Sequence, residues 1–102
     1  MGLGYALSEN MIREEGIVLN PNFQDYKIPT ALDAVDLECI FVESKDINGP
    51  FGAKGLGEPA MIATAPAISN AIYDAIGVRI RELPITPEKI LRALREKGKD
   101  NS

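Results

Sequence analysis

The sequence has no histidine and only one cysteine, and both scarcities limit its chemistry. Without histidine, the chain itself cannot carry Ser-His or Cys-His catalysis or a His-ligated metal. Cys39 has no partner for an intrachain disulfide and belongs to no cluster with metal-ligand spacing. We expect it to be a buried, apolar thiol. Acid–base chemistry must therefore come from carboxylates, lysine or tyrosine.

Positive charge and long apolar runs are also scarce. The chain has 11 Lys and Arg against 15 Asp and Glu, for a formal net charge of −4. The basic residues are scattered, so no stripe could neutralise successive phosphates of a nucleic acid. No apolar run approaches the ~18 residues that span a bilayer, and no signal peptide is visible. We expect a soluble, cytoplasmic protein that binds neither nucleic acid nor membrane.

The composition, 45% hydrophobic and 25% charged, is typical of a globular protein. Residues 1–102 make one domain, and we expect its polar tail, residues 97–102, to fray. A domain this short buries only about two thirds of the surface that its unfolded chain exposes. It therefore often depends on a partner or a larger parent protein.

Apolar residues near the N-terminus recur at helical spacing, at Leu3, Ala6, Leu7, Met11 and Ile12. They predict a helix that ends at Gly16 as its C-cap. No Ser, Thr, Asp or Asn cap precedes this helix, which suggests that Met1 is a truncation point or an alternative start. Ile17–Leu19 is a predicted strand, and Asp36–Glu43 is another, with apolar residues on both faces.

A helix is predicted from Ile62 to Ile76, where small and apolar residues recur every three or four positions and Gly77 closes the run. Pro66 predicts either a kink or the point where a short first turn gives way to the main helix. Residues 78–83 alternate apolar and charged side chains, which indicates an exposed or edge strand.

The last predicted helix begins at Pro87, with Thr86 as its N-cap. Its buried stripe is expected to contain Ile90, Leu91 and Leu94. The predicted class is α+β, as a small mixed domain in the order helix, strand, strand, helix, strand, helix.

The segment Gly49–Pro59, GPFGAKGLGEP, lies between a predicted strand and a predicted helix. Its glycines would let a ligand approach the backbone or present N–H groups to an anion. Their spacing fits neither the dinucleotide fingerprint nor a phosphate-binding P-loop. Composition alone leaves ligand binding and a plain connecting loop both open.

Glu58 ends this loop, just before Pro59 and the apolar helix. One interpretation is a surface carboxylate that stabilises the helix dipole by a few tenths of a kcal/mol. The other is a partly desolvated carboxylate that points into a cavity and takes a proton. The residues alone do not choose between these roles.

Five sequence blocks occur in the order GLGYALSE, LNPNFQDYKIPTALD, GPFGAKGLGEPAM, TAPAISNAIYDAIGVRI and ELPITPEKIL. They cover most of the chain. Together they resemble the C-terminal part of the molybdenum-binding subunit of molybdenum hydroxylases, the family of xanthine dehydrogenase and aldehyde oxidase. The most specific block is GAKGLGEP, residues 52–59.

This resemblance implies a fragment of a larger molybdopterin-binding domain in an oxidoreductase. Glu58 would be the active-site base, which deprotonates a molybdenum-bound hydroxide. In the mechanism that the resemblance implies, the deprotonated oxygen would attack an electron-poor carbon of an aldehyde or N-heterocycle, and hydride would pass to a sulfido ligand. Lys54, Gly55, Leu56 and Gly57 would line the cofactor pocket, where Lys54 either anchors the loop or contacts an anion. No residue here is expected to ligate the metal.

The chain also departs from the family. A whole subunit is several times longer, most molybdopterin contacts lie in segments absent here, and Met1 stands where the family has a Gln before Gly2-Leu3-Gly4. The implied partners are the rest of the subunit and iron–sulfur and FAD subunits or domains. We expect the isolated chain to bind no cofactor, to be inactive and to self-associate as a homo-oligomer. The alternative is a non-catalytic remnant that serves as a structural or interaction module.

Overall fold

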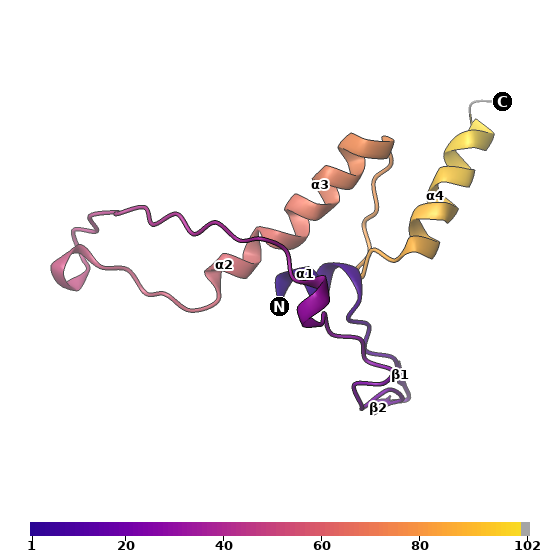
Figure 1. Cartoon of the computed structure of the whole chain (residues 1–102), viewed down its shortest axis with the longest axis horizontal. Coiled ribbons are helices and arrows are strands. Elements are labelled where there is room, and N and C mark those ends of the chain that lie inside the picture. Colours follow the sequence, from indigo (N-terminus) through magenta and orange to yellow (C-terminus); the bar gives the residue numbers. More distant parts are fainter. Residues whose placement is uncertain (101–102) are drawn as a thin grey trace.

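The computed structural model describes residues 1–100, which contain helices and one small sheet (Figure 1). The α-helices are α1 (Gly2–Leu7), α2 (Pro59–Ile62), α3 (Thr64–Ile76) and α4 (Pro87–Asp100). The strands are β1 (Arg13–Glu14) and β2 (Ile17–Val18). Two short 3-10 helices are η1 (Ala31–Asp33) and η2 (Pro50–Gly52). The mixture of helix and strand is as predicted, but the predicted element order is not reproduced.

The tightest packing joins α1, α3 and residues 83–86, which we call the packed region. The backbone N–H of Ile85 donates a hydrogen bond to the carbonyl of Ala6 (2.7 Å). Ala6 and Ile85 are almost fully buried. Gly2 lies so close to Thr64 on α3 that a Cβ at this position would come within 2.6 Å of the threonine hydroxyl. The absence of a side chain at Gly2 therefore permits the close contact of α1 with α3.

Residues 10–20 form a hairpin instead of the predicted continuation of the first helix. Arg13 pairs with Val18 in an antiparallel register, and the two turn residues, Glu15 and Gly16, have φ of 48° and 83°. Positive φ at both positions is the signature of a two-residue turn whose twist suits a hairpin. The buried Asn20 closes the base, because its side chain accepts a hydrogen bond from the N–H of Ile12 (2.9 Å) and donates one to a carbonyl at position 10 (2.7 Å).

The predicted helix between residues 62 and 76 is confirmed as α3, preceded by the short α2. Pro66 stands in the first turn of α3, where a short first segment gives way to the main helix, as expected. Gly77 ends α3 in the left-handed conformation, with φ of 65°.

The last helix is also confirmed. The Thr86 hydroxyl accepts a hydrogen bond from the N–H of Lys89 at the start of α4 (3.4 Å). The helix continues through Lys97 to Asp100, so residues 97–100 are helical where fraying was expected, and 101–102 lie outside the described residues. Leu91 and Leu94 are exposed, which corrects the prediction of a buried stripe.

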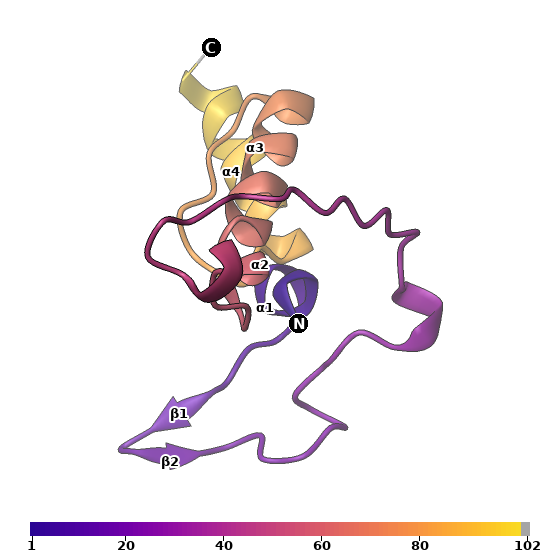
Figure 2. The same ribbon diagram turned by 90° about the vertical axis from the view of Figure 1, so that its left-hand side faces the viewer.

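Residues 34–58, which we call the arm, leave the packed region and return to α2 as a long open loop (Figures 1 and 2). Among the described residues neither 36–43 nor 78–83 forms a strand, so both strand predictions are wrong for the chain by itself. A strand requires a hydrogen-bonded neighbour, and no described segment provides one here. Cys39 lies in the arm and is exposed, which corrects its expected burial.

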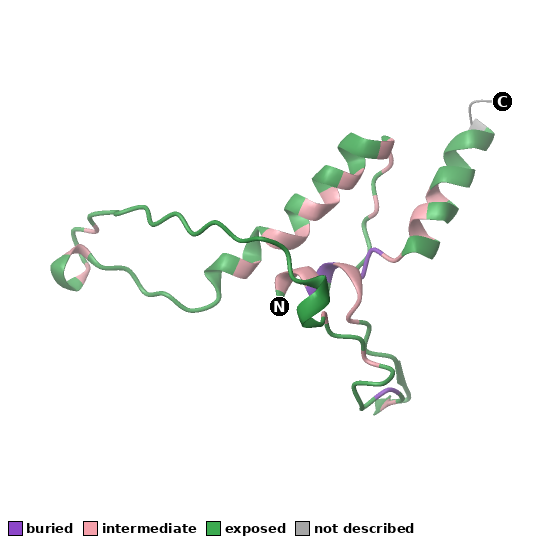
Figure 3. Cartoon of the chain, viewed as in Figure 1, coloured by how far each residue is buried: buried purple, intermediate pink, exposed green. Residues whose placement is uncertain are grey.

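The chain is elongated. Its radius of gyration is 18.2 Å, against about 13 Å for a compact domain of 100 residues. Among the residues whose burial is described, Figure 3 shows buried ones only in α1, just before α4 and at the hairpin. Many large apolar side chains are therefore exposed. Within residues 1–100, no helix combines the length and apolar character that a bilayer span requires.

Candidate active site

Glu58 lies where the arm joins α2. Its backbone carbonyl accepts a hydrogen bond from the N–H of Met61 (3.0 Å), and Pro59 begins the helix. Its carboxylate caps no backbone N–H and makes no hydrogen bond or ion pair with the rest of the described chain. It is exposed, so the cavity expected around it is not formed by this chain. The α2 helix has only four residues, which leaves little dipole for Glu58 to stabilise.

The loop before Glu58 is irregular and exposed throughout Lys54–Gly57. Neither Gly55 nor Gly57 has a left-handed φ, and a Cβ built on either would meet no atom within 4 Å. Gly49 is different, because a Cβ there would collide with the carbonyl oxygen of Ala53. Gly55 and Gly57 are therefore not required by the chain's own packing, and they leave room for something that approaches from outside.

Part of this loop faces a hollow between the two sides of the arm. The hollow has a volume of about 510 Å³ and is lined by residues 42–45 on one side and 51–56 on the other. The structure thus brings Lys54, Gly55 and Leu56 together around one space. Gly57 and Glu58 lie outside this lining.

Two parts of the hollow were not predicted as site residues. The segment Val42–Lys45 forms the opposite wall, and residues 51–53, which begin with Phe51, extend the wall that contains Lys54. The position of Val42–Lys45 depends on how the arm folds back, which no local pattern specifies. Phe51 did carry a signal, since a large apolar residue between Pro50 and Gly52 is unusual in a glycine-rich turn.

The tip of the arm is held by short-range hydrogen bonds. The N–H of Asp46 donates to the carbonyl of Gly52 (3.1 Å), and the Asp46 carboxylate accepts from the N–H of Asn48 (2.9 Å). Phe51 has φ of 55°, a left-handed conformation that costs a residue with a side chain roughly 1 to 2 kcal/mol. These bonds fix the bend that sets the two walls of the hollow opposite each other.

The charges around the hollow are mixed. Lys45 and Lys54 bring positive charge to its lining, and Glu43 brings negative charge. Within the described residues, Lys54 forms no salt bridge. Both of its expected roles, as an anchor of the loop or as a contact to an anion, therefore remain predictions. Among the described side chains, those of residues 1–99, no group of three acidic or cysteine residues could hold a metal ion.

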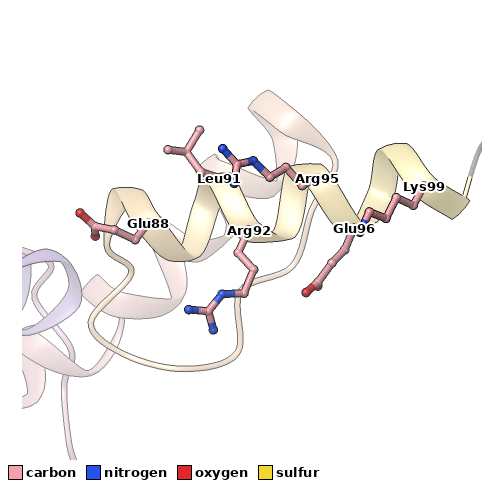
Figure 4. Close-up of a pocket in the computed structure, with 6 residues that line it drawn as sticks. All are labelled: Glu88, Leu91, Arg92, Arg95, Glu96 and Lys99. Atoms are coloured by element: carbon pink, nitrogen blue, oxygen red, sulfur yellow. The ribbon is translucent and has the colours of Figure 1, made fainter.

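A second hollow lies over α4, and Figure 4 shows its lining. Its residues are Glu88, Leu91, Arg92, Arg95, Glu96 and Lys99. All of them come from a single helix, and they carry both signs of charge. This hollow is the space between side chains on one exposed helix face, on the opposite side of the molecule from the arm (Figure 1), and we do not consider it part of the site.

Comparison with known proteins identifies relatives of this chain. Residues 1–35 match the family model of the molybdopterin cofactor-binding domain. The chain is 48% identical over 92 residues to the xanthine dehydrogenase molybdenum-binding subunit of Escherichia coli O157:H7. It is 45% identical over 93 residues to subunit gamma of the 6-hydroxypseudooxynicotine dehydrogenase complex of Paenarthrobacter nicotinovorans. These alignments cover 88% and 87% of this chain and 12% of each relative.

A solved structure shares the fold. The chain matches quinoline 2-oxidoreductase from Pseudomonas putida 86 with a TM-score of 0.78 and 35% sequence identity, over 93% of this chain and 13% of that one. The elongated shape is therefore also found in a segment of a much longer enzyme chain. Fold and sequence together match this chain to one segment of the molybdenum-binding subunits.

This chain belongs to the xanthine dehydrogenase and aldehyde oxidase family of molybdenum hydroxylases, among the molybdenum-binding subunits. It spans about an eighth of the length of the curated relatives that it matches. The family resemblance found in the sequence is thereby confirmed.

Proposed function

We propose that this chain contributes the active-site base, Glu58, to a molybdenum hydroxylase that oxidises an aldehyde or an N-heterocycle. The site would be completed by the rest of a molybdenum-binding subunit, and electrons would leave through iron–sulfur and FAD partners. The observation that carries the proposal is a carboxylate without a partner in the described chain, at the end of a loop whose last two glycines, Gly55 and Gly57, the chain's own packing does not explain.

The residues present fit a molybdopterin cofactor. The cofactor, when bound, supplies the two-electron redox chemistry and the Lewis acidity that makes a water-derived proton easy to remove. Glu58 would take that proton on its carboxylate. A carboxylate is one of the groups that can do this in a chain without histidine, and Glu58 is the carboxylate of the glycine-rich loop.

The loop before Glu58 would position the cofactor. Gly55 and Gly57 would let the pterin or its phosphate approach the backbone, because open space surrounds both positions. Lys54 would present an ammonium group to an anionic part of the cofactor. Leu56, which is exposed in the chain alone, would exclude water once the rest of the subunit covers it.

The proposal is tested by Glu58→Gln in the assembled enzyme. Gln keeps the shape of Glu but cannot take the proton, so we expect turnover to fall by at least ~10²-fold. The thermal midpoint should not change, because the carboxylate makes no bond to the described chain that the substitution would break. Single-turnover reduction of the cofactor by substrate measures the chemical step directly.

The matched control is Glu96→Gln, an exposed carboxylate on α4, outside the candidate site. We expect it to leave the rate within a factor of about three, since a charge that takes no proton contributes little to the chemical step. A Glu58→Gln enzyme as fast as the unsubstituted one would remove the basis for the proposal. It would instead favour the non-catalytic alternative.

A further inference from the structure

The segment from Asp36 to Glu43 has extended backbone but no partner. None of its backbone N–H or carbonyl groups makes a hydrogen bond within residues 1–100. Its composition is that of a strand, with Ile40, Phe41 and Val42 in succession. Backbone polar groups that become buried must be paired, so an apolar segment like this one needs a neighbouring strand in its working state.

The side chains of this segment show what kind of strand it is. Alternation places Leu37 and Phe41 on one face and Ile40 and Val42 on the other. These four side chains are 77% to 90% exposed. An edge strand or a one-sided sheet would have a polar face. Asp36 and Glu38 make the first half of the second face polar, so it is the later part of the segment, residues 39–42, whose apolar side chains on both faces indicate a strand that is covered on both sides and lies inside a sheet.

The partner of this segment must pair its backbone groups and cover its apolar side chains on both faces. A small molecule or a lipid surface cannot pair backbone groups along eight residues. A second copy of the chain could pair with one edge of the segment, but it would leave the other edge unpaired. The rest of a molybdenum-binding subunit can supply strands at both edges and cover both faces. The match to quinoline 2-oxidoreductase supports this occupant, since an equally shaped segment makes up only 13% of that chain.

We propose that residues 36–43 are an internal strand of a β-sheet that the rest of the molybdenum-binding subunit completes. The proposal rests on the proposed function for the identity of the partner. It adds a consequence for the site, because the strand ends in Val42–Lys45, the wall that faces Lys54, Gly55 and Leu56. Pairing of this strand fixes that wall and thereby orders the loop that leads to Glu58.

Amide hydrogen exchange tests the pairing directly. The chain would be expressed with the Escherichia coli relative from which the matching segment is deleted, and exchange would be compared with that of the chain alone. We expect amides 36–43 to exchange at least ~10²-fold more slowly in the complex, because ladder hydrogen bonds protect them. Circular dichroism of the deleted subunit establishes beforehand that it is folded.

Two proline variants test whether association depends on backbone pairing of the strand or only on contacts made elsewhere in the chain. Ile40→Pro removes an N–H from the middle of the strand, and we expect it to weaken association by at least ~10-fold. Ala34→Pro is the control, because position 34 lies outside the strand and already has a φ of −66°, close to that of proline. It should associate as the unsubstituted chain does.

Several outcomes would overturn the proposal. They are the absence of association with the folded, deleted subunit, unprotected amides 36–43 within a formed complex, or normal association of Ile40→Pro. Protection already present in a homo-oligomer of the chain would assign the strand to a second copy instead. The strand proposal and the catalytic proposal for Glu58 can fail separately. Protected amides 36–43 together with a fully active Glu58→Gln enzyme would support the strand and reject the catalytic role. Unprotected amides together with an inactive Glu58→Gln enzyme would reject the strand and support the catalytic role.

Discussion

A side chain added at Gly2, in the packed region, would come within 2.6 to 2.9 Å of Thr64, whereas one added at Gly57, in the arm, would meet no atom within 4 Å. Gly2 is thus explained by the chain's own packing, and Gly57 is not. The same difference applies to apolar side chains. Ile85 is 2% exposed in the packed region, while Ile47 in the arm is 96% exposed. The packed region buries its own apolar side chains and explains its own glycines. The arm has apolar side chains and glycines that are typical of a region covered by another part of a protein.

The largest effect on this comparison is expected from Ile85→Ala. Among residues 1–99, Ile85 is the one large side chain that is fully buried, and truncation of a buried Ile costs about 2 to 5 kcal/mol. Because so small a core has little stability to spare, we expect the 102-residue chain to lose its cooperative urea transition, followed by circular dichroism.

The matched control is Ile47→Ala, which removes the same atoms from the arm. It should change the free energy of unfolding by less than about 0.5 kcal/mol, as is usual for an exposed position. Equal losses from the two variants would show that the arm is packed in solution and would contradict the comparison.

A smaller effect should distinguish Gly2→Ala from Gly57→Ala. At Gly2 the new methyl group would overpack against Thr64, at a cost of about 1 to 3 kcal/mol, which exceeds the gain of up to about 1 kcal/mol from alanine in a helix. At Gly57 the chain alone should be unchanged or slightly more stable.

In the assembled enzyme, Gly57→Ala should be the more damaging of the two substitutions, because its effect there is on turnover. If the cofactor approaches the backbone at Gly57, a methyl group there displaces it, and we expect at least a ~10-fold loss of turnover. Urea unfolding of the chain and steady-state kinetics of the enzyme measure the two halves. A Gly57→Ala enzyme with unchanged kinetics would show that the cofactor does not approach the backbone at Gly57.

The elements predicted correctly are those whose signals are local. Gly77 is the left-handed C-cap of α3, and Thr86 with Pro87 marks the start of α4, whatever the rest of the chain does. The hairpin was missed because Met11 and Ile12 continue the helical spacing of α1. The turn that competes with that helix is made by Glu15 and Gly16, and its stability also depends on Asn20, which the apolar periodicity does not include.

The strand at Asp36–Glu43 was predicted from composition, but a strand forms only when a partner provides the second half of each hydrogen bond. The site divides in the same way. Lys54 to Glu58 were named from a contiguous motif and a family resemblance, and their catalytic and binding roles remain predictions. The wall at Val42–Lys45 could not be named, because its position depends on how the arm folds back.

The smallest expected effect concerns pH and lies at the border of the packed region, where the Tyr26 hydroxyl donates a hydrogen bond to the Glu9 carboxylate (2.7 Å). This hydrogen bond, with burial and the negative charge of Glu9, raises the pKa of Tyr26 above its ordinary value of 10.0. Because the folded-state pKa is the higher one, the stabilisation is fully present below about pH 10 and is lost as the pH rises through the folded-state pKa. We therefore expect the unsubstituted chain to lose more stability than Tyr26→Phe between about pH 8 and pH 11, as measured by urea unfolding. The control is Tyr73→Phe, which removes a hydroxyl that, among the described residues, has no hydrogen bond to a carboxylate and should leave the pH dependence of stability as in the unsubstituted chain. If the unsubstituted chain, Tyr26→Phe and Tyr73→Phe all showed the same pH dependence, the contact between Tyr26 and Glu9 would not form in solution.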